Sequence, residues 1–358
     1  MKASRIFAVI GIVLILALSA CSGKDATPGQ ASETSGGTIT ENTSGGSESP
    51  DEPATTGKGD FNLNNPAAGL EELTSYQVTL IMKFEGTSNG SPFSAEQQFS
   101  AAVDRLASLR TLTENYENSN GETDALNTTA LGGLVYALDT ETQTCNAVST
   151  GESDARVYEP AGSLPAFRGG EEAGSEIIDG VNAKVYTFDA LALNAGKDAK
   201  ADGKVWIADP GGWVVKYSLT LQAGEEVFGK GYEGTQTWEY TLTQANTAVV
   251  ELPQGCTAPL TGLPVLEDAA GLQQLPGGMH YSTAQSADAV GTFYKDQLTA
   301  AGWEVKNELP SGSAGAQWLF SKVEERKELV LMVLAQPQED GSLLVSLMQV
   351  ETKAAVAQ

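Results

Sequence analysis

Apolar and polar residues alternate along three segments of the chain, 76–84, 213–222 and 236–244. This alternation is the pattern of a strand with one buried face and one solvent face. The apolar positions are Tyr76, Val78, Leu80, Met82 and Phe84, then Trp213, Val215, Tyr217 and Leu219, and finally Trp238, Tyr240 and Leu242. We therefore predict three long strands, each with one apolar face.

Shorter patterns extend this mainly β region. Further strands are expected at 93–104, 105–117, 131–138, 184–188 and 204–208, with a turn at 209–212. A short helix is expected from Pro66 to Leu73, because Asn65 is a good N-cap and proline favours the first helical position. Long antiparallel strands with one polar face need other elements against their apolar face. The sequence therefore predicts a mainly β domain over residues 61–257.

The proline-rich stretch 253–264 leads to a second, smaller domain, predicted over residues 263–352. One helix is expected here, with Ser286 as its N-cap and Gly302 at its end. Its apolar stripe comprises Val290, Phe293, Tyr294, Leu298 and Ala301. Strands are expected at 279–282, 303–306, 317–323, 328–335 and 343–350. The order β-α-β-β-β-β describes an α+β domain with one helix on an antiparallel sheet.

The N-terminus has the three parts of a secretory signal. Lys2 and Arg5 precede the apolar stretch 6–18, which is too short to span a bilayer and is followed by small residues before Cys21. The tetrad Leu18–Cys21 resembles the lipobox of bacterial lipoproteins. That resemblance implies removal of residues 1–20, fatty acylation of Cys21 and a membrane anchor in the cell envelope, outside the cytoplasm. The alternative is an ordinary secreted protein with a chance cysteine.

Residues 21–60 are predicted to be a disordered tether, because they hold almost no residue that could join a core. The precursor carries a net charge of −25, and losing Lys2 and Arg5 makes the mature chain −27. Such a charge disfavours nucleic-acid partners and repels anionic membrane surfaces. Cys145 and Cys256 are the cysteines left after lipidation, and we expect a disulfide bond between them in an oxidising compartment. Two free thiols are the alternative.

No set of residues stands out as catalytic. Gly224, Gly229 and Lys230 have most of the spacing of a phosphate-binding loop, but Gly231 stands where that motif needs Ser or Thr. His280 is the only histidine, so a metal site with two histidines is excluded. Paired carboxylates for glycoside chemistry stay open, because the many acids include no marked pair. We expect a protein that is not an enzyme and needs no cofactor or metal.

Three short motifs carry a family resemblance. They are Leu70-Glu71-Glu72-Leu73, Ser75-Tyr76 and the hairpin Val205-Trp206-Ile207-Ala208-Asp209-Pro210. With them, residues 66–256 resemble the LolA-like lipoprotein carriers and the mycobacterial lipoproteins of the LppX and LprG type. The resemblance implies an N-terminal helix and an incomplete antiparallel β-barrel, or half-barrel, whose concave apolar face receives acyl chains. No ligand-binding residue of that family has a marked counterpart here. Residues 265–350 resemble small domains appended to other envelope lipoproteins.

Two functions follow from these patterns. The first is a membrane-anchored protein that binds a lipid or another apolar ligand, with the apolar positions of the three alternating segments as its candidate lining. The second is a protein-interaction or envelope-sensor lipoprotein. In that case the helix from Pro66 to Leu73 and the loop around Leu164 to Phe167 fill the same face completely. Alternation is the same in both cases, so the sequence leaves both open and names no protein partner.

Overall fold

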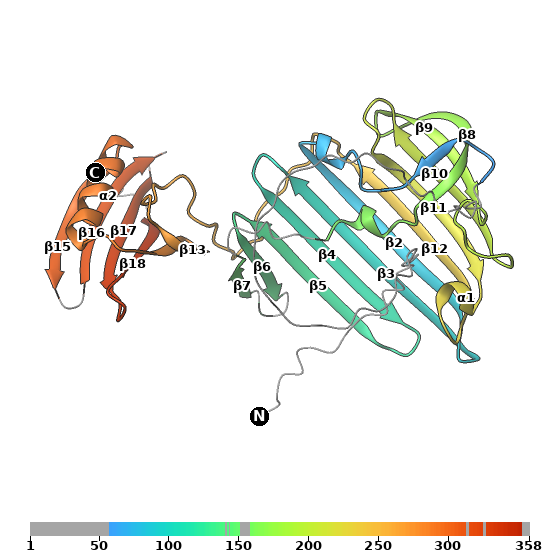
Figure 1. Cartoon of the computed structure of the whole chain (residues 1–358), viewed down its shortest axis with the longest axis horizontal. Coiled ribbons are helices and arrows are strands. Elements are labelled where there is room, and N and C mark those ends of the chain that lie inside the picture. The colour runs from blue at the N-terminus through green and yellow to red at the C-terminus, as the bar shows by residue number, and fades with distance from the viewer. Residues whose placement is uncertain are drawn as a thin grey trace, which may run out of the picture.

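The computed structural model describes residues 57–139, 142, 144–150, 158–312, 315–324 and 327–352. The expected signal peptide, Cys21 and most of the expected tether lie outside the described residues. Two antiparallel sheets dominate the molecule (Figure 1). The fold class predicted from the sequence is confirmed: a large antiparallel sheet that does not close into a barrel is followed by a small sheet with one helix.

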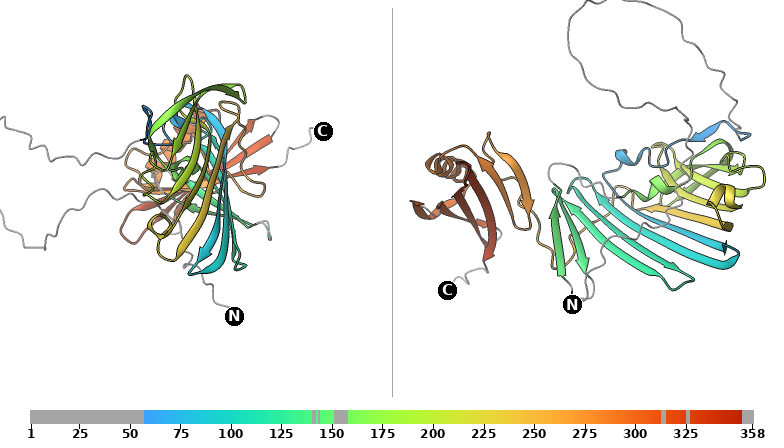
Figure 2. Two further views of the ribbon diagram at one scale, coloured as in Figure 1. Left: turned by 90° about the vertical axis from the view of Figure 1, so that its right-hand side faces the viewer. Right: turned by 60° about the horizontal axis from the view of Figure 1, so that its bottom comes forward.

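The first sheet has the strand order β1-β8-β9-β10-β11-β12-β2-β3-β4-β5-β6-β7. Its strands are β1 (Phe61–Leu63), β2 (Ser75–Ser88), β3 (Ser91–Asp104), β4 (Leu109–Asn118), β5 (Thr123–Leu131), β6 (Leu134–Asp139), β7 (Thr144–Ser149), β8 (Phe167–Ile178), β9 (Val181–Asp189), β10 (Lys200–Ala208), β11 (Val214–Ala223) and β12 (Tyr232–Thr243). β1 and β7 are its edges. The sheet curves strongly at the β1 side, as Figure 2 shows, and we call it the half-barrel.

Antiparallel pairing aligns the apolar positions of neighbouring strands on the concave face. Leu80 on β2 pairs with Tyr240 on β12 and with Phe99 on β3, and Tyr240 pairs with Tyr217 on β11. All four side chains are buried. Because successive residues point to opposite faces, one row of large apolar side chains crosses these four strands on the concave face. The outer face of the same strands carries mostly polar residues.

The helix expected from Pro66 to Leu73 is wrong as an α-helix. Turns occupy this segment, with a single 3-10 turn, η1 (Leu70–Glu72), near its end. Gly69 before η1 has a φ of 81°, which a right-handed helix does not allow. An added Cβ at Gly69 would also lie 2.8 Å from the carbonyl oxygen of Gly211. The close approach of these two chain segments therefore determines the backbone conformation at Gly69, in spite of the helical pattern in the sequence.

Several strands of the half-barrel lie outside the ranges that alternation predicted. β1, β5, β7 and β8 were not expected, and the first residues of the expected strand 105–117 form a turn, in which the side chain of Asp104 accepts a hydrogen bond from Ala107 N at 3.0 Å. β5 is rich in Thr, and β8 is rich in Gly and Glu. Such strands lack the apolar periodicity from which a strand is recognised, and their neighbours in the sheet determine their pairing.

The second sheet has the strand order β13-β14-β18-β17-β16-β15. Its elements are β13 (Ala270–Leu275), β14 (Gly278–Thr283), α2 (Ala287–Ala300), β15 (Glu304–Gly312), β16 (Gly315–Glu324), β17 (Lys327–Pro337) and β18 (Leu343–Thr352). Ser286 caps α2, since its hydroxyl accepts a hydrogen bond from Ala289 N at 3.3 Å. One strand, β13, precedes the predicted order β-α-β-β-β-β.

A linker joins the two sheets and crosses the outer face of the half-barrel. Near its start, Asn246 N donates to the carbonyl of Ser75 at 2.7 Å. Further along, the hydroxyl of Tyr136 on β6 donates to the carbonyl of Thr257 at 2.7 Å. The second sheet then lies beyond β7 (Figure 1). The two sheets have separate apolar cores; that each folds alone stays a prediction.

The expected disulfide bond joins Cys145 on β7 to Cys256 in the linker, with their Cα atoms 5.3 Å apart. This distance is ordinary for a disulfide bond. The bond holds the linker against the edge strand of the half-barrel just before the chain enters the second sheet.

Candidate functional site

The concave face of the half-barrel holds most of the residues predicted to line a ligand site. Eight of them are buried among one apolar cluster: Tyr76, Val78, Leu80, Tyr217, Leu219, Trp238, Tyr240 and Leu242. Met82 and Phe84 lie at its border and are partly buried. The alternating segments thus meet on one face, where a long apolar surface crosses β11, β12 and β2.

Val215 does not share this face. Ile207 pairs with Val214 and Trp206 pairs with Lys216, so Val215 is an extra residue on β11. This β-bulge shifts the alternation by one position. Val215 therefore packs on the outer face with Ala183, Val185, Trp206 and Ala208, and the prediction that it lines the concave face is wrong. Trp213, just before β11, contacts both clusters.

Short elements from distant parts of the chain cover the concave face. They are η1, η2 (Pro160–Ser163) and α1 (Glu225–Phe228), together with the loops beside them. Their buried apolar side chains include Leu70, Leu73, Leu164, Phe167 and Phe228. Phe167 stacks on Phe188 with ring centroids 3.9 Å apart. Across the described residues, the buried part of the concave face is therefore packed by the chain itself.

We call residues 158–167, which include η2, the cover segment. Two buried tyrosines of the sheet bind it. The hydroxyl of Tyr217 donates to the carbonyl of Pro165 at 2.9 Å, and the hydroxyl of Tyr76 donates to the Glu159 carboxylate at 2.7 Å. Burial raises the pKa of the Tyr217 hydroxyl well above its usual value, so the group stays neutral and remains a hydrogen-bond donor.

A third tyrosine hydroxyl beneath the cover segment has no hydrogen-bond partner among the described residues. It belongs to Tyr240, whose side chain is fully buried. Burial raises the pKa of this hydroxyl, and the nearby charge of Glu159 and the Tyr76 hydroxyl raise it further. A buried hydroxyl without a partner is costly. It is available to a water molecule or to a polar atom of a ligand.

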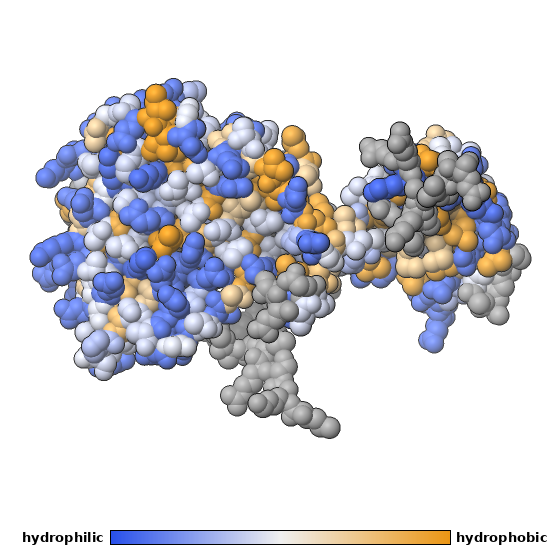
Figure 3. Space-filling view, turned by 180° about the vertical axis from the view of Figure 1, so that it is seen from behind, coloured by the Kyte–Doolittle hydropathy of each residue, from blue (hydrophilic) through white to orange (hydrophobic). Residues whose placement is uncertain are grey.

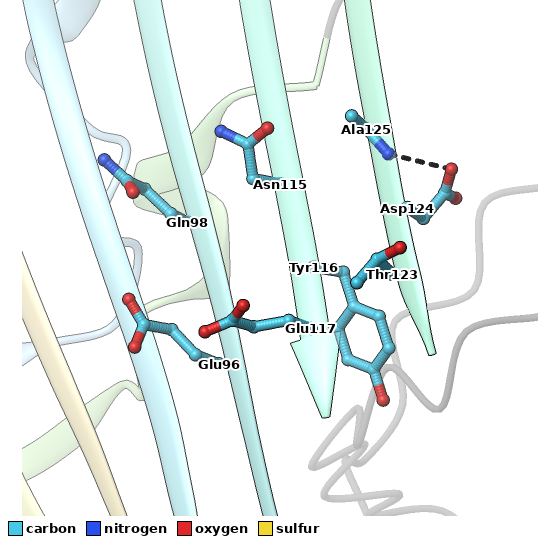
Figure 4. A pocket seen from close by; sticks show the side chains of 8 residues that line it. All are labelled: Glu96, Gln98, Asn115, Tyr116, Glu117, Thr123, Asp124 and Ala125. Atoms are coloured by element: carbon cyan, nitrogen blue, oxygen red, sulfur yellow. Dashed lines mark hydrogen bonds between the residues drawn. The ribbon is translucent and has the colours of Figure 1, made fainter. Parts of the chain in front are cut away.

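A separate hollow of about 540 Å³ lies over β3, β4 and β5 (Figure 4). Its lining is polar and comprises Glu96, Gln98, Asn115, Tyr116, Glu117, Thr123, Asp124 and Ala125. Lys83 on the neighbouring strand forms an ion pair with Glu96 at 2.9 Å. Sequence reasoning missed this hollow, because polar residues on alternating positions look the same on any solvated sheet face. It is unsuited to an acyl chain.

The other candidate residues lie apart from the concave face. Gly224 and Gly229 flank the single turn of α1 between two strands, so this segment is a hairpin loop. His280 Nε2 lies 3.1 Å from Gln273 Oε1 on the second sheet. Among the described residues, no group of three or more His, Cys, Asp or Glu side chains could hold a metal ion. No helix in this part of the chain is long and apolar enough to cross a membrane.

The comparisons with known proteins bear first on the second sheet. Residues 273–341 match a family model described as START domain-like. This is a lipid-binding-like fold, and the matched segment contains α2 and parts or all of β13 to β17. It covers less than half of the chain. The LolA-like resemblance of residues 66–256 stays a prediction.

Among solved structures, the chain is similar to a DUF1329 family protein from Desulfovibrio piger, at 10% sequence identity and a TM-score of 0.13. The match covers 52% of this chain and 96% of that protein. With that TM-score, the similarity supports no functional conclusion. No match was found among the curated proteins.

Proposed function

We propose that this protein is a lipoprotein of the cell envelope, held to a membrane by acyl chains on Cys21, and that its half-barrel binds a lipid or another apolar ligand on the concave face. The observation that carries the proposal is that only short elements cover that face. η1, η2 and α1 have only three or four residues each. Elements of this length are not stable by themselves and depend on the packing beneath them.

The cover segment is the part best placed to move. Its polar contacts with the sheet include two hydrogen bonds, from Tyr76 and Tyr217, each contributing about 0.5–1.5 kcal/mol net. Its main apolar contacts come from Leu164 and Phe167, at about 1.5–3 kcal/mol each. An acyl chain with about ten buried methylenes gains about 8 kcal/mol. A lipid that replaces these side chains on the concave face can therefore offset the free energy lost when the cover segment leaves the sheet.

The START domain-like match supports the same class of ligand. Residues 273–341 give the protein a second region with a lipid-binding-like fold. The envelope location rests on the lipobox, and a net charge of −25 would otherwise keep the protein away from anionic membrane surfaces. A covalent anchor and an apolar ligand site fit together in one tethered lipid-binding protein.

A second candidate function is a non-enzymatic interaction or sensor lipoprotein. The observation that favours it is the packing of the concave face, since Leu80, Tyr217 and Leu219 have no exposed surface. In that case the face is only a core and the cover segment stays in place. The two candidates differ in one measurable property, which is whether the protein takes up an apolar ligand.

The experiment uses the full chain with Cys21→Ser, mixed with vesicles of phosphatidylcholine that contain a pyrene-labelled acyl chain. After the vesicles are removed, the pyrene that stays with the protein is measured. Lipid binding predicts uptake, and Tyr217→Phe, which releases the cover segment from the sheet, raises the initial rate about fivefold for about 1 kcal/mol. Tyr136→Phe is the matched control, because it removes a similar bond from the outer face.

Uptake at the same rate in the parent and both variants would contradict opening at the cover segment. No uptake in any of them leaves the second candidate function. The anchor is tested in the same cells: the native protein should stay with washed membranes, and Cys21→Ser should release it. Retention of Cys21→Ser on the membrane would contradict lipidation.

A further inference from the structure

Among the residues that the structure describes, no element covers one face of the second sheet. α2 packs on the opposite face, where Phe320, Leu331, Val333, Val345 and Leu347 have no exposed surface. The alternate residues of the same strands point away from α2. We call this side of the sheet the open face. Its large apolar side chains are Leu309, Leu319, Val330, Met332, Leu334, Leu344 and Met348.

These side chains lie outside the buried cores of the described residues. Leu309 is 51% exposed and Met348 is 42% exposed, and the others are half-buried by their neighbours in the sheet. They are also contiguous, since Leu319 pairs with Met332 and Met332 pairs with Met348. Apolar surface gathers on this part of the molecule in Figure 3. Contiguous apolar surface of this kind marks an interaction site.

The centre of the open face also lacks charge. Two rows of residues cross all six strands without one Asp, Glu, Lys or Arg. They are Leu309, Gln317, Leu334, Ser346, His280 and Gln273, and then Asn307, Leu319, Met332, Met348, Gly278 and Leu275. A chain with 46 acidic and 21 basic residues has charges to place on a solvated face. Their exclusion here is what a surface buried against another apolar surface requires.

We infer that the open face is the interface of a homodimer, in which the open faces of two copies pack against each other about a two-fold axis. Two apolar sheet faces pack about 10 Å apart with interdigitated side chains. The two uncharged rows and the neighbouring row through Gln336, Leu344, Ser282 and Ala270 cover about 500 Å² on each copy, from the ordinary spacings of a sheet. Two copies therefore bury about 1,000 Å², which reaches the size that a specific interface needs.

The charges of this region do not prevent the pairing. Glu304, Glu308 and Glu324 each form an ion pair with a lysine of the same chain, at 2.9, 3.2 and 2.6 Å. Their charge is thus partly balanced before two copies meet. The remaining negative charge is spread over the rest of the molecule and is screened by salt. Dimerisation is therefore expected to strengthen as salt is added, whereas binding to a basic partner would weaken.

Sedimentation velocity of the full chain with Cys21→Ser tests the dimer. From about 1 to about 200 µM protein, the account predicts a shift from monomer to dimer in the micromolar range. Met332→Glu places a charge at the centre of the open face and is expected to weaken dimerisation at least about tenfold. Leu106→Glu is the matched control, because Leu106 is 86% exposed in a turn of the half-barrel.

A monomer at every concentration overturns the proposal, and so does a dimer that Met332→Glu and Leu106→Glu leave equally strong. Unchanged melting of both variants shows that neither acts by unfolding. Flotation with neutral phosphatidylcholine vesicles tests whether lipid occupies the open face instead. If the protein binds the vesicles as a monomer and Met332→Glu abolishes this binding, the open face is a lipid site and the dimer is contradicted.

Discussion

The disulfide bond between Cys145 and Cys256 gives the sharpest test of the fold. The bond closes a loop with a sequence separation of 111 residues, which includes five complete strands of the half-barrel, β8 to β12. For a loop of about that length, the chain-entropy model gives a loss of about 16 cal/mol/K in the unfolded chain, or about 4.8 kcal/mol at room temperature. This is an upper value, because compact unfolded chains already lose part of that entropy.

The variant for this test is Cys145→Ser with Cys256→Ser in the Cys21→Ser chain, so that no free thiol remains. Urea unfolding is followed by tryptophan fluorescence, to which the half-barrel contributes Trp206, Trp213 and Trp238. We expect the free energy of unfolding of the half-barrel to fall by about 3–5 kcal/mol. Chemical reduction of the parent should produce the same loss. A loss below about 1 kcal/mol in both experiments would refute the reasoning that the bond restrains the unfolded chain.

Two further predictions concern stability. Burial raises the pKa of Tyr136 to about 12. Above about pH 10, Tyr136 therefore loses its proton in the unfolded chain but keeps it in the folded chain. Between about pH 10 and this folded pKa, the free energy of unfolding falls by up to about 1.4 kcal/mol per pH unit. Urea unfolding between about pH 9 and about pH 11.5 checks this, and a slope that Tyr136→Phe leaves unchanged would contradict it. Ser286→Ala removes the N-cap of α2 and is expected to destabilise the second sheet by about 1 kcal/mol, with Ser286→Asp as the conservative control. Equal melting of Ser286→Ala and the parent would contradict the capping role.

The sequence predicted those elements in which the contrast between the two faces is strong. β2 has this contrast from Tyr76 to Phe84 and β12 has it from Trp238 to Leu242, and the cap at Ser286 is a local signal. The prediction failed at Val215, because a bulge depends on how two strands pair and leaves no mark in the alternation. It failed at Gly69 because contacts with a distant segment set the backbone there.

The sequence did not predict whether the concave face is an open cavity or a packed core. Leu164 and Phe167, which cover it, come from a loop and the start of a glycine-rich strand, neither with a periodic pattern. The same alternation describes a lined cavity and a filled core. The sequence named the loop around Leu164 to Phe167 as a possible cover, but contacts between residues far apart along the chain decide whether it packs there. That choice, and the open face of the second sheet, became visible only in three dimensions.

Native mass spectrometry of the full chain with Cys21→Ser, purified without detergent from the cells that secrete it, tests the central claim most directly. The proposed function predicts a population whose mass exceeds that of the protein by a lipid, and that lipid should be released when the protein unfolds. A single species at the mass of the unliganded protein, in a sample that also takes up no pyrene-labelled phosphatidylcholine, would contradict lipid binding by the half-barrel.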